Sequence, residues 1–220
     1  MSQNIKAYFM VVFATLFWAG NFNIGKFASI ENISPFTLAF LRWLLVWIIL
    51  MPFTYKEIYR LKKTIFKNFK FLFILGLSSV FLYSALTYKA LNYTQVINAS
   101  LFNTAAPAAI ILVCLLLKIE KTNIFQLSGL LISTLGILAI ITKLDLNIFL
   151  SLDFNRGDLF MIIAIISWGV YSAFLKKRNF EISLLGLVQI ICTFGLFLLA
   201  PVFLIELNQG NSINLNFNLF

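Results

Sequence analysis

The chain has 220 residues, of which 61% are apolar and only 11% are charged, and its net charge is +9. Soluble globular domains are closer to half apolar and a quarter charged, so this composition excludes an ordinary soluble domain. It predicts an all-α fold, a polytopic bundle of helices embedded in a lipid bilayer.

Seven apolar segments are long enough to cross a bilayer, which takes about 20 helical residues. In chain order the predicted spans are 8–26, 35–53, 71–89, 95–117, 124–142, 159–175 and 182–205. We expect the first to be retained as a helix, since no small-residue cleavage pattern precedes Lys26. Ser34 and Pro35 supply an N-cap and a first-turn proline ahead of the second span. Residues 155–158 begin the sixth span in a similar way.

Lysine and arginine are distributed unevenly over the joints between the spans. Twelve lie on the side of the N-terminus and four on the opposite side. This bias predicts a cytoplasmic N-terminus, in a membrane of the bacterial inner-membrane type. It also accounts for the net charge, so we expect the basic stretch 56–70 to meet lipid headgroups and no nucleic acid.

Three pairs of residues recur at nearly constant spacing and indicate an internal repeat. They are Trp18 with Trp168 at 150 residues, and Ser34 with Ser183 and Pro52 with Pro201 at 149 residues. The first predicted helix thus resembles the sixth, and the second resembles the seventh. A repeat of five helices is odd in number, so its second copy enters the membrane in the opposite sense. Inverted repeats of this kind are typical of secondary transporters.

The repeat divides the chain into three parts. We predict a first five-helix repeat over 1–143, the first two helices of a second repeat over 157–206, and a polar tail over 207–220. The second repeat then lacks three helices. Either the chain is truncated, or a homo- or hetero-oligomer supplies the missing helices from another polypeptide.

Short motifs along residues 8–205 carry a resemblance to a known family. They are Phe17-Trp18-Ala19-Gly20-Asn21 with Lys26, Ser34-Pro35-Phe36 with Arg42, Ala90-Leu91-Asn92-Tyr93-Thr94, Asn98-Ala99-Ser100-Leu101 with Pro107, Glu120-Lys121 through Gln126, Gly129 and Gly136, and Gly157-Asp158 with Trp168. Together they resemble the EamA-type members of the drug/metabolite transporter superfamily. The resemblance implies ten helices in two repeats, cytoplasmic termini, and export of small metabolites or amino acids.

Arg42 lies deep in the second predicted span, about 11 Å from its start at 1.5 Å per residue. A charge at this depth is costly, and none of the seven predicted spans offers an Asp or Glu at similar depth. Two interpretations stay open. Arg42 binds the carboxylate or phosphate of a substrate, or it lines a hydrated gap and holds the first helix through Asn21.

The fourth span contains Asn103, Thr104 and Pro107. Proline removes the amide that would bond the carbonyl of Asn103, which predicts a kink there. Asn103 and Thr104 then either line a substrate path or form hydrogen bonds between helices. Trp18 and Trp168 lie inside their spans, where they either wall a cavity or fill space by packing.

Three further residues are assigned structural roles. Gly129 and Gly136 recur at helical spacing in the fifth span, and small residues there let helix backbones approach closely. Glu120 follows the fourth span beside two lysines, and we expect it to form a solvated ion pair that fixes this joint.

Nothing in the sequence points to enzymatic chemistry. The chain has no histidine, and its two cysteines lie singly in separate spans, so we expect neither an enzyme nor a cofactor or metal site. The sequence predicts alternating-access transport of a small anionic or zwitterionic metabolite. The residues predicted to bind it are Arg42, Asn21, Trp18, Asn103 and Thr104. The alternative is a non-transporting remnant or an assembly subunit.

Overall fold

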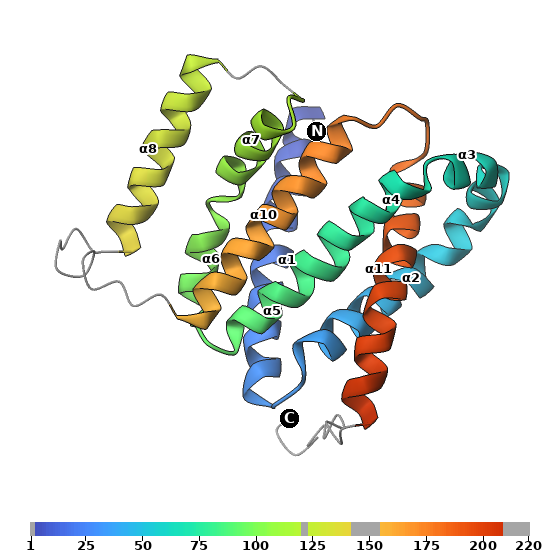
Figure 1. Ribbon diagram of the computed structural model, residues 1–220, viewed down its shortest axis with the longest axis horizontal. Coiled ribbons are helices and arrows are strands. Elements are labelled where there is room, and N and C mark those ends of the chain that lie inside the picture. The colour runs from blue at the N-terminus through green and yellow to red at the C-terminus, as the bar shows by residue number, and fades with distance from the viewer. Residues whose placement is uncertain (1–2, 120–122, 142–154, 209–220) are drawn as a thin grey trace.

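The computed structural model describes residues 3–119, 123–141 and 155–208, and every regular element within these ranges is a helix (Figure 1). In chain order they are α1 (Gln3–Ile30), α2 (Pro35–Arg60), α3 (Lys62–Lys67), α4 (Phe69–Gly76), the π-helix η1 (Leu77–Ser84), α5 (Ala85–Leu91), α6 (Val96–Asn103), α7 (Ala106–Leu116), α8 (Ile124–Ile141), α10 (Arg156–Lys176) and α11 (Leu184–Asn208).

Within the described ranges, six segments are long and apolar enough to cross a membrane. They are Ile5–Ile30, Pro35–Arg60, Phe69–Leu91, Val96–Leu116, Arg156–Lys176 and Leu184–Asn208. Each coincides with one of the predicted spans. The chain is therefore a polytopic α-helical integral membrane protein.

The remaining predicted span, 124–142, corresponds to α8, whose apolar stretch Ile124–Gly136 is shorter than the other six. This helix contacts α6 and α7 and lies at the edge of the bundle (Figure 1). A Cβ atom built on Gly129 or Gly136 meets no described atom within 4 Å. The described residues thus place no partner against these glycines, and the close packing predicted at them stays a prediction. Glu120 lies outside the described residues.

Two helix starts and one helix break follow from local sequence. Pro35 opens α2 as predicted, and Ser34 occupies the N-cap position, but the Ser34 side chain makes no capping hydrogen bond. At the start of α10 the Asp158 amide donates to Asn155 Oδ1 at 3.0 Å, and the Asn155 amide donates to Asp158 Oδ2 at 3.0 Å. This reciprocal capping box satisfies two backbone donors of the first turn. The kink predicted before Pro107 is confirmed, since α6 ends at Asn103 and α7 begins at Ala106.

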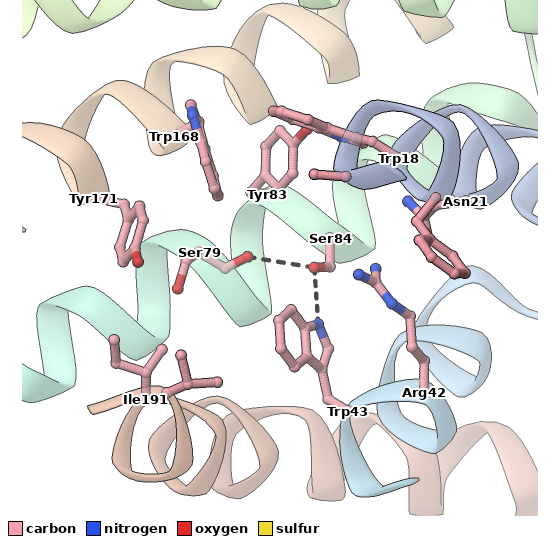
Figure 2. A pocket seen from close by; sticks show the side chains of 13 residues that line it. Trp18, Asn21, Arg42, Trp43, Ser79, Tyr83, Ser84, Trp168, Tyr171 and Ile191 are labelled. Atoms are coloured by element: carbon pink, nitrogen blue, oxygen red, sulfur yellow. Dashed lines mark hydrogen bonds between the residues drawn. The ribbon is translucent and has the colours of Figure 1, made fainter. Parts of the chain in front are cut away.

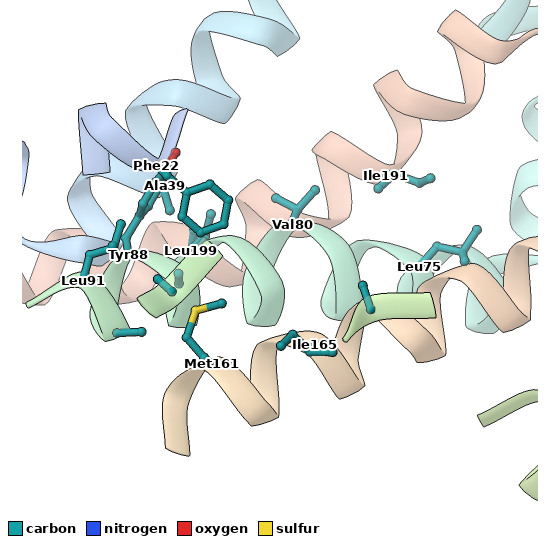
Figure 3. Close-up of a cluster of buried hydrophobic side chains, with 14 of the residues drawn as sticks. Phe22, Ala39, Leu75, Val80, Tyr88, Leu91, Met161, Ile165, Ile191 and Leu199 are labelled. Atoms are coloured by element: carbon teal, nitrogen blue, oxygen red, sulfur yellow. The ribbon is translucent and has the colours of Figure 1, made fainter. Parts of the chain in front are cut away.

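The third span, made of α4, η1 and α5, runs through the centre of the bundle. It contacts α10 along one side and α2 and α11 along others, and the largest cluster of buried apolar side chains surrounds it (Figure 3). Lipid is as apolar as these side chains, so close packing takes the place of the hydrophobic effect as the main source of helix association. Gly195 illustrates this, because a Cβ atom there would lie 2.1 Å from Val80 Cγ1.

The antiparallel pair α2 and α11 is joined at both ends by a carboxylate. Glu206 Oε2 accepts hydrogen bonds from the amide and hydroxyl of Thr37 at 3.1 and 2.9 Å, and the Ser34 hydroxyl donates to Glu206 Oε1. At the other end Glu57 Oε1 accepts from the Ser183 amide at 2.8 Å, and the Ser183 hydroxyl donates to Glu57 Oε2. We name these contacts the Glu206 clasp (Ser34, Thr37, Glu206) and the Glu57 clasp (Glu57, Ser183). The two glutamates are 149 residues apart, as are the two serines.

Candidate functional site

A cavity of about 340 Å³ lies between α1, α2, η1, α10 and α11, and we name it the aromatic cavity (Figure 2). Its lining is mostly apolar and aromatic. It consists of Ala14, Phe17, Trp18, Asn21, Arg42, Trp43, Ser79, Tyr83, Ser84, Trp168, Tyr171, Val188 and Ile191. Arg42 is the one charged residue in this described lining, so the cavity wall supplies no carboxylate to neutralise it.

Arg42 is held by a neutral partner and an aromatic face. Its Nη1 donates to the hydroxyl of Tyr88 at 2.9 Å, and its Cζ lies 4.9 Å from the centroid of the Trp43 ring. A cation over an indole is attracted to the negative face of the ring. Neither contact cancels the charge, although placing a guanidinium at membrane depth costs at least about 2.5–3.5 kcal/mol. These two contacts therefore leave the positive charge of Arg42 in place at the cavity wall.

Tyr88 connects Arg42 to Asn21. The Tyr88 hydroxyl accepts from Arg42 and donates to Asn21 Oδ1 at 2.5 Å, so three helices, α1, α2 and α5, meet in one hydrogen-bonded network. The link between Arg42 and the first helix was predicted through Asn21, but it is indirect. Tyr88 is 2% exposed and was not singled out in the sequence.

The wall opposite Arg42 is a set of aromatic rings around Trp168. Its ring centroid lies 6.0 Å from that of Trp18, 4.8 Å from that of Tyr83 and 5.0 Å from that of Tyr171. Trp18 and Trp168, which recur at a spacing of 150 residues, thus meet in the cavity wall. They pack against each other and enclose the cavity, so both roles considered for them are present.

The π-helix η1 places polar groups at the cavity. The hydroxyls of Ser78 and Ser79 donate to the carbonyls of Ile74 and Leu75, each at 2.6 Å. Serine hydroxyls in such positions compete with backbone amides for carbonyls, and wide π turns often occur at functional sites. Ser84 accepts from Trp43 Nε1 at 2.9 Å and so fixes that ring beside Arg42 (Figure 2).

The structure brings three of the five predicted binding residues, Arg42, Asn21 and Trp18, to the aromatic cavity. Asn103 does not line it, but its Oδ1 accepts from the hydroxyl of Tyr83, a wall residue, at 3.1 Å. Thr104 is exposed, donates to the carbonyl of Leu101 and does not line this cavity, so its predicted role on a substrate path stays a prediction. It lies in the break between α6 and α7, which turns it away from the bundle.

Several polar and aromatic residues of the site were not predicted from the sequence. They are Trp43, Ser79, Tyr83, Ser84, Tyr88 and Tyr171. One signal for some of them was present, because the third predicted span carries several serines and tyrosines within an otherwise apolar run.

A second cavity of about 330 Å³ adjoins the first, and we name it the Tyr88 cavity. It is lined by Phe17, Asn21, Ile24, Leu38, Arg42 and Tyr88. Three of these residues, Phe17, Asn21 and Arg42, line both cavities.

Comparisons with known proteins agree with one another. Residues 5–142 match the model of the EamA-like transporter family. A protein of Archaeoglobus fulgidus named "Uncharacterized transporter" is 34% identical over 178 residues, which cover 80% of this chain and 59% of that protein. "Uncharacterized transporter YyaM" of Bacillus subtilis is 27% identical over 174 residues, which cover 77% of this chain and 55% of the YyaM chain. The chain thus spans little more than half the length of these curated relatives. No solved structure matches it.

Proposed function

Because the chain belongs to the EamA-like transporter family, we propose that it takes part in moving a small metabolite across the membrane and that the aromatic cavity binds this metabolite. The observation that carries the proposal is Arg42, a cation deep in a membrane span whose described cavity lining contains no carboxylate. A volume of about 340 Å³ is within the range of small-molecule sites.

The lining favours a particular class of cargo. A guanidinium binds a carboxylate or phosphate through charge-assisted hydrogen bonds, often two in parallel. The rings of Trp18, Trp168 and Tyr83 suit an apolar or aromatic body, and an amine can lie against their faces. We therefore propose an amino acid or a small organic acid as the substrate, with its anionic group on Arg42.

The direction and mechanism are part of the same proposal. The excess of lysine and arginine on one side supports a cytoplasmic N-terminus in a bacterial-type inner membrane. The spacing of 149–150 residues between like residues supports an inverted repeat, in which alternating access exposes one site to each side in turn. The resemblance favours export.

Further helices complete the transport unit in this proposal. Phe17 lines both cavities and yet is 78% exposed, so the side of the cavities formed by α1 is open within the described structure. The curated relatives continue well beyond the matched length. We propose that the three helices missing from the second repeat, from the same or another polypeptide, cover this side.

Flux measurements test the proposal. Lipid vesicles containing the chain are assayed for uptake and efflux of a labelled panel of amino acids and organic acids. The Arg42→Ala variant serves as the comparison after equal insertion is verified. We expect the flux of an anionic cargo to fall about ten-fold or more, since a hydrogen-bonded charge contact is lost.

Two results would contradict it. Equal flux in the parent and in Arg42→Ala would remove the anion-binding role. Absence of flux from a well-inserted parent chain, repeated with candidate partner helices supplied, would favour the non-transporting remnant or assembly subunit.

A further inference from the structure

We infer that Tyr88 is the resting partner of Arg42, and that an anionic group of the substrate takes its place and thereby opens the boundary between the two cavities. This inference rests on the proposed function. It assigns a gating role to a buried tyrosine at the edge of the substrate site.

The two cavities lie one beyond the other along the bundle. The Tyr88 cavity includes Ile24 and Leu38, which are near the end of α1 and the start of α2. The aromatic cavity reaches Tyr171 and Val188, which are near the end of α10 and the start of α11. These are opposite ends of the molecule, because α1 and α11 run in one direction and α2 and α10 run in the other (Figure 1).

The network of Arg42, Tyr88 and Asn21 forms the boundary. Arg42 and Asn21 line both cavities, whereas Tyr88 lines only the second of them. The hydrogen bonds of 2.9 Å from Arg42 to Tyr88 and of 2.5 Å from Tyr88 to Asn21 tie α2 and α1 across this position. The network therefore lies where the two cavities adjoin.

The chemistry of the bond makes it exchangeable. A phenol oxygen is a neutral acceptor, whereas a carboxylate or phosphate oxygen is charged and forms a stronger bond with a guanidinium. A carboxylate that accepts two parallel N–H bonds sets the plane of the guanidinium, so an anion in the aromatic cavity competes with the Tyr88 hydroxyl for Arg42. Once Arg42 turns to the anion, the tie between α1 and α2 through Tyr88 is broken.

The tyrosine ring itself is fixed, so Arg42 is the group that changes partner. Tyr88 is 2% exposed, and its ring packs against Gly25, where a Cβ atom would lie 2.7 Å from Tyr88 Cδ1. Beside it, Lys26 Nζ donates to the carbonyls of Leu91 and Thr94 at 2.9 and 3.0 Å and holds α1 to the end of α5. The hydroxyl thus keeps its place while the guanidinium is free to leave it.

The Tyr88→Phe variant tests this, because it keeps the ring and removes the hydroxyl. Binding of labelled 3-phenylpropionate, an aromatic carboxylate, is measured for the full chain in lipid nanodiscs. We expect Tyr88→Phe to bind this probe about ten-fold more tightly than the parent, because the competing hydrogen bond is gone. The matched control is Tyr93→Phe, at a tyrosine that lines neither cavity, and it should bind like the parent.

Other outcomes separate the inference from the proposed function. Unchanged or weaker binding by Tyr88→Phe, together with loss of binding in Arg42→Gln, would make Tyr88 a mere support for Arg42 and overturn the inference alone. Equal binding by the parent and Arg42→Gln would overturn the anion site and the inference with it. If Tyr88→Phe does not fold, Asn21→Ala is measured instead. That variant removes the acceptor that polarises the phenol, so the Tyr88 hydroxyl competes less well for Arg42 and the probe should bind more tightly than to the parent. Unchanged affinity would overturn the inference.

Discussion

Each of the two clasps that join α2 and α11 pairs a serine with a glutamate, and the two serines, like the two glutamates, are 149 residues apart, but their surroundings differ. In the Glu206 clasp, the carboxylate accepts three hydrogen bonds and Thr37 is only 1% exposed. In the Glu57 clasp, the carboxylate accepts two bonds, both from Ser183, which is exposed. Water can replace the partner of an exposed donor but not that of a buried one. The comparison teaches that a repeated sequence pattern can reproduce a contact while burial sets its strength.

The difference bears on the site, because α2 and α11 both contribute residues to the lining of the aromatic cavity. Arg42 lies five residues beyond Thr37, about 7.5 Å along α2 at 1.5 Å per residue. Val188 lies five residues beyond Ser183 on α11. Each clasp therefore anchors one wall residue, and the stronger one is near the cation.

The largest effect on stability is expected at the buried end. Glu206→Ala removes the acceptor of the Thr37 amide and hydroxyl, which then remain buried without a partner. We expect the free energy of unfolding to fall by about 2–3 kcal/mol, measured by reversible unfolding in mixed detergent micelles. Glu181→Ala, at an exposed glutamate, is the control. A loss no larger than that of the control would show that the Glu206 clasp contributes nothing.

A smaller effect is expected at the exposed end. Glu57→Ala releases the amide and hydroxyl of Ser183 to solvent, which can bond to both. The same unfolding experiment should show a loss of about 0.5 kcal/mol, at the low end of the range for a helix cap. A loss as large as that of Glu206→Ala would contradict the view that burial distinguishes the two clasps.

The smallest net effect is expected for Gly186→Ala. Its new Cβ atom would lie 2.6 Å from Glu57 Oε2, so the flexible glutamate has to move and the Glu57 clasp opens. Replacing glycine by alanine in a helix gains about 0.8–1 kcal/mol, which offsets the lost clasp. The net change should stay within about 0.5 kcal/mol of the parent, on either side.

A double-mutant cycle sharpens this prediction. In the Glu57→Ala background the clash is absent, so Gly186→Ala should stabilise the protein by close to the full helix-propensity gain. Equal effects of Gly186→Ala in both backgrounds would mean that the alanine and Glu57 do not interact.

Much of the fold could be predicted because its signals are local. Six bilayer-length apolar runs, the first-turn proline of α2, the cap at Asn155 and the break before Pro107 each depend on neighbouring residues in the chain. The place of α8 could not be predicted in this way. The small residues Gly129 and Gly136 indicate that close packing is possible, but not that another helix is there to pack against.

The site was predicted only where one residue stands out by itself. Arg42 is conspicuous because a charge within an apolar span needs an explanation. Tyr88 is not, since tyrosine is common in such spans and its role depends on α1 and α2 meeting around it. Glu57 and Glu206 are separated by the same number of residues as Ser34 and Ser183. The hydrogen bonds of each serine to a glutamate become evident only when α2 and α11 are seen to be antiparallel.

The central claim is that Arg42 makes the aromatic cavity a site for an anion, and one binding comparison tests it most directly. The parent chain and Arg42→Gln are titrated in nanodiscs with 3-phenylpropionate and with 3-phenylpropionamide, which are alike in size and differ in charge. The parent should prefer the acid about ten-fold, and Arg42→Gln should lose that preference while its affinity for the amide is unchanged. An undiminished preference for the acid in Arg42→Gln, or no preference in the parent, would contradict the account.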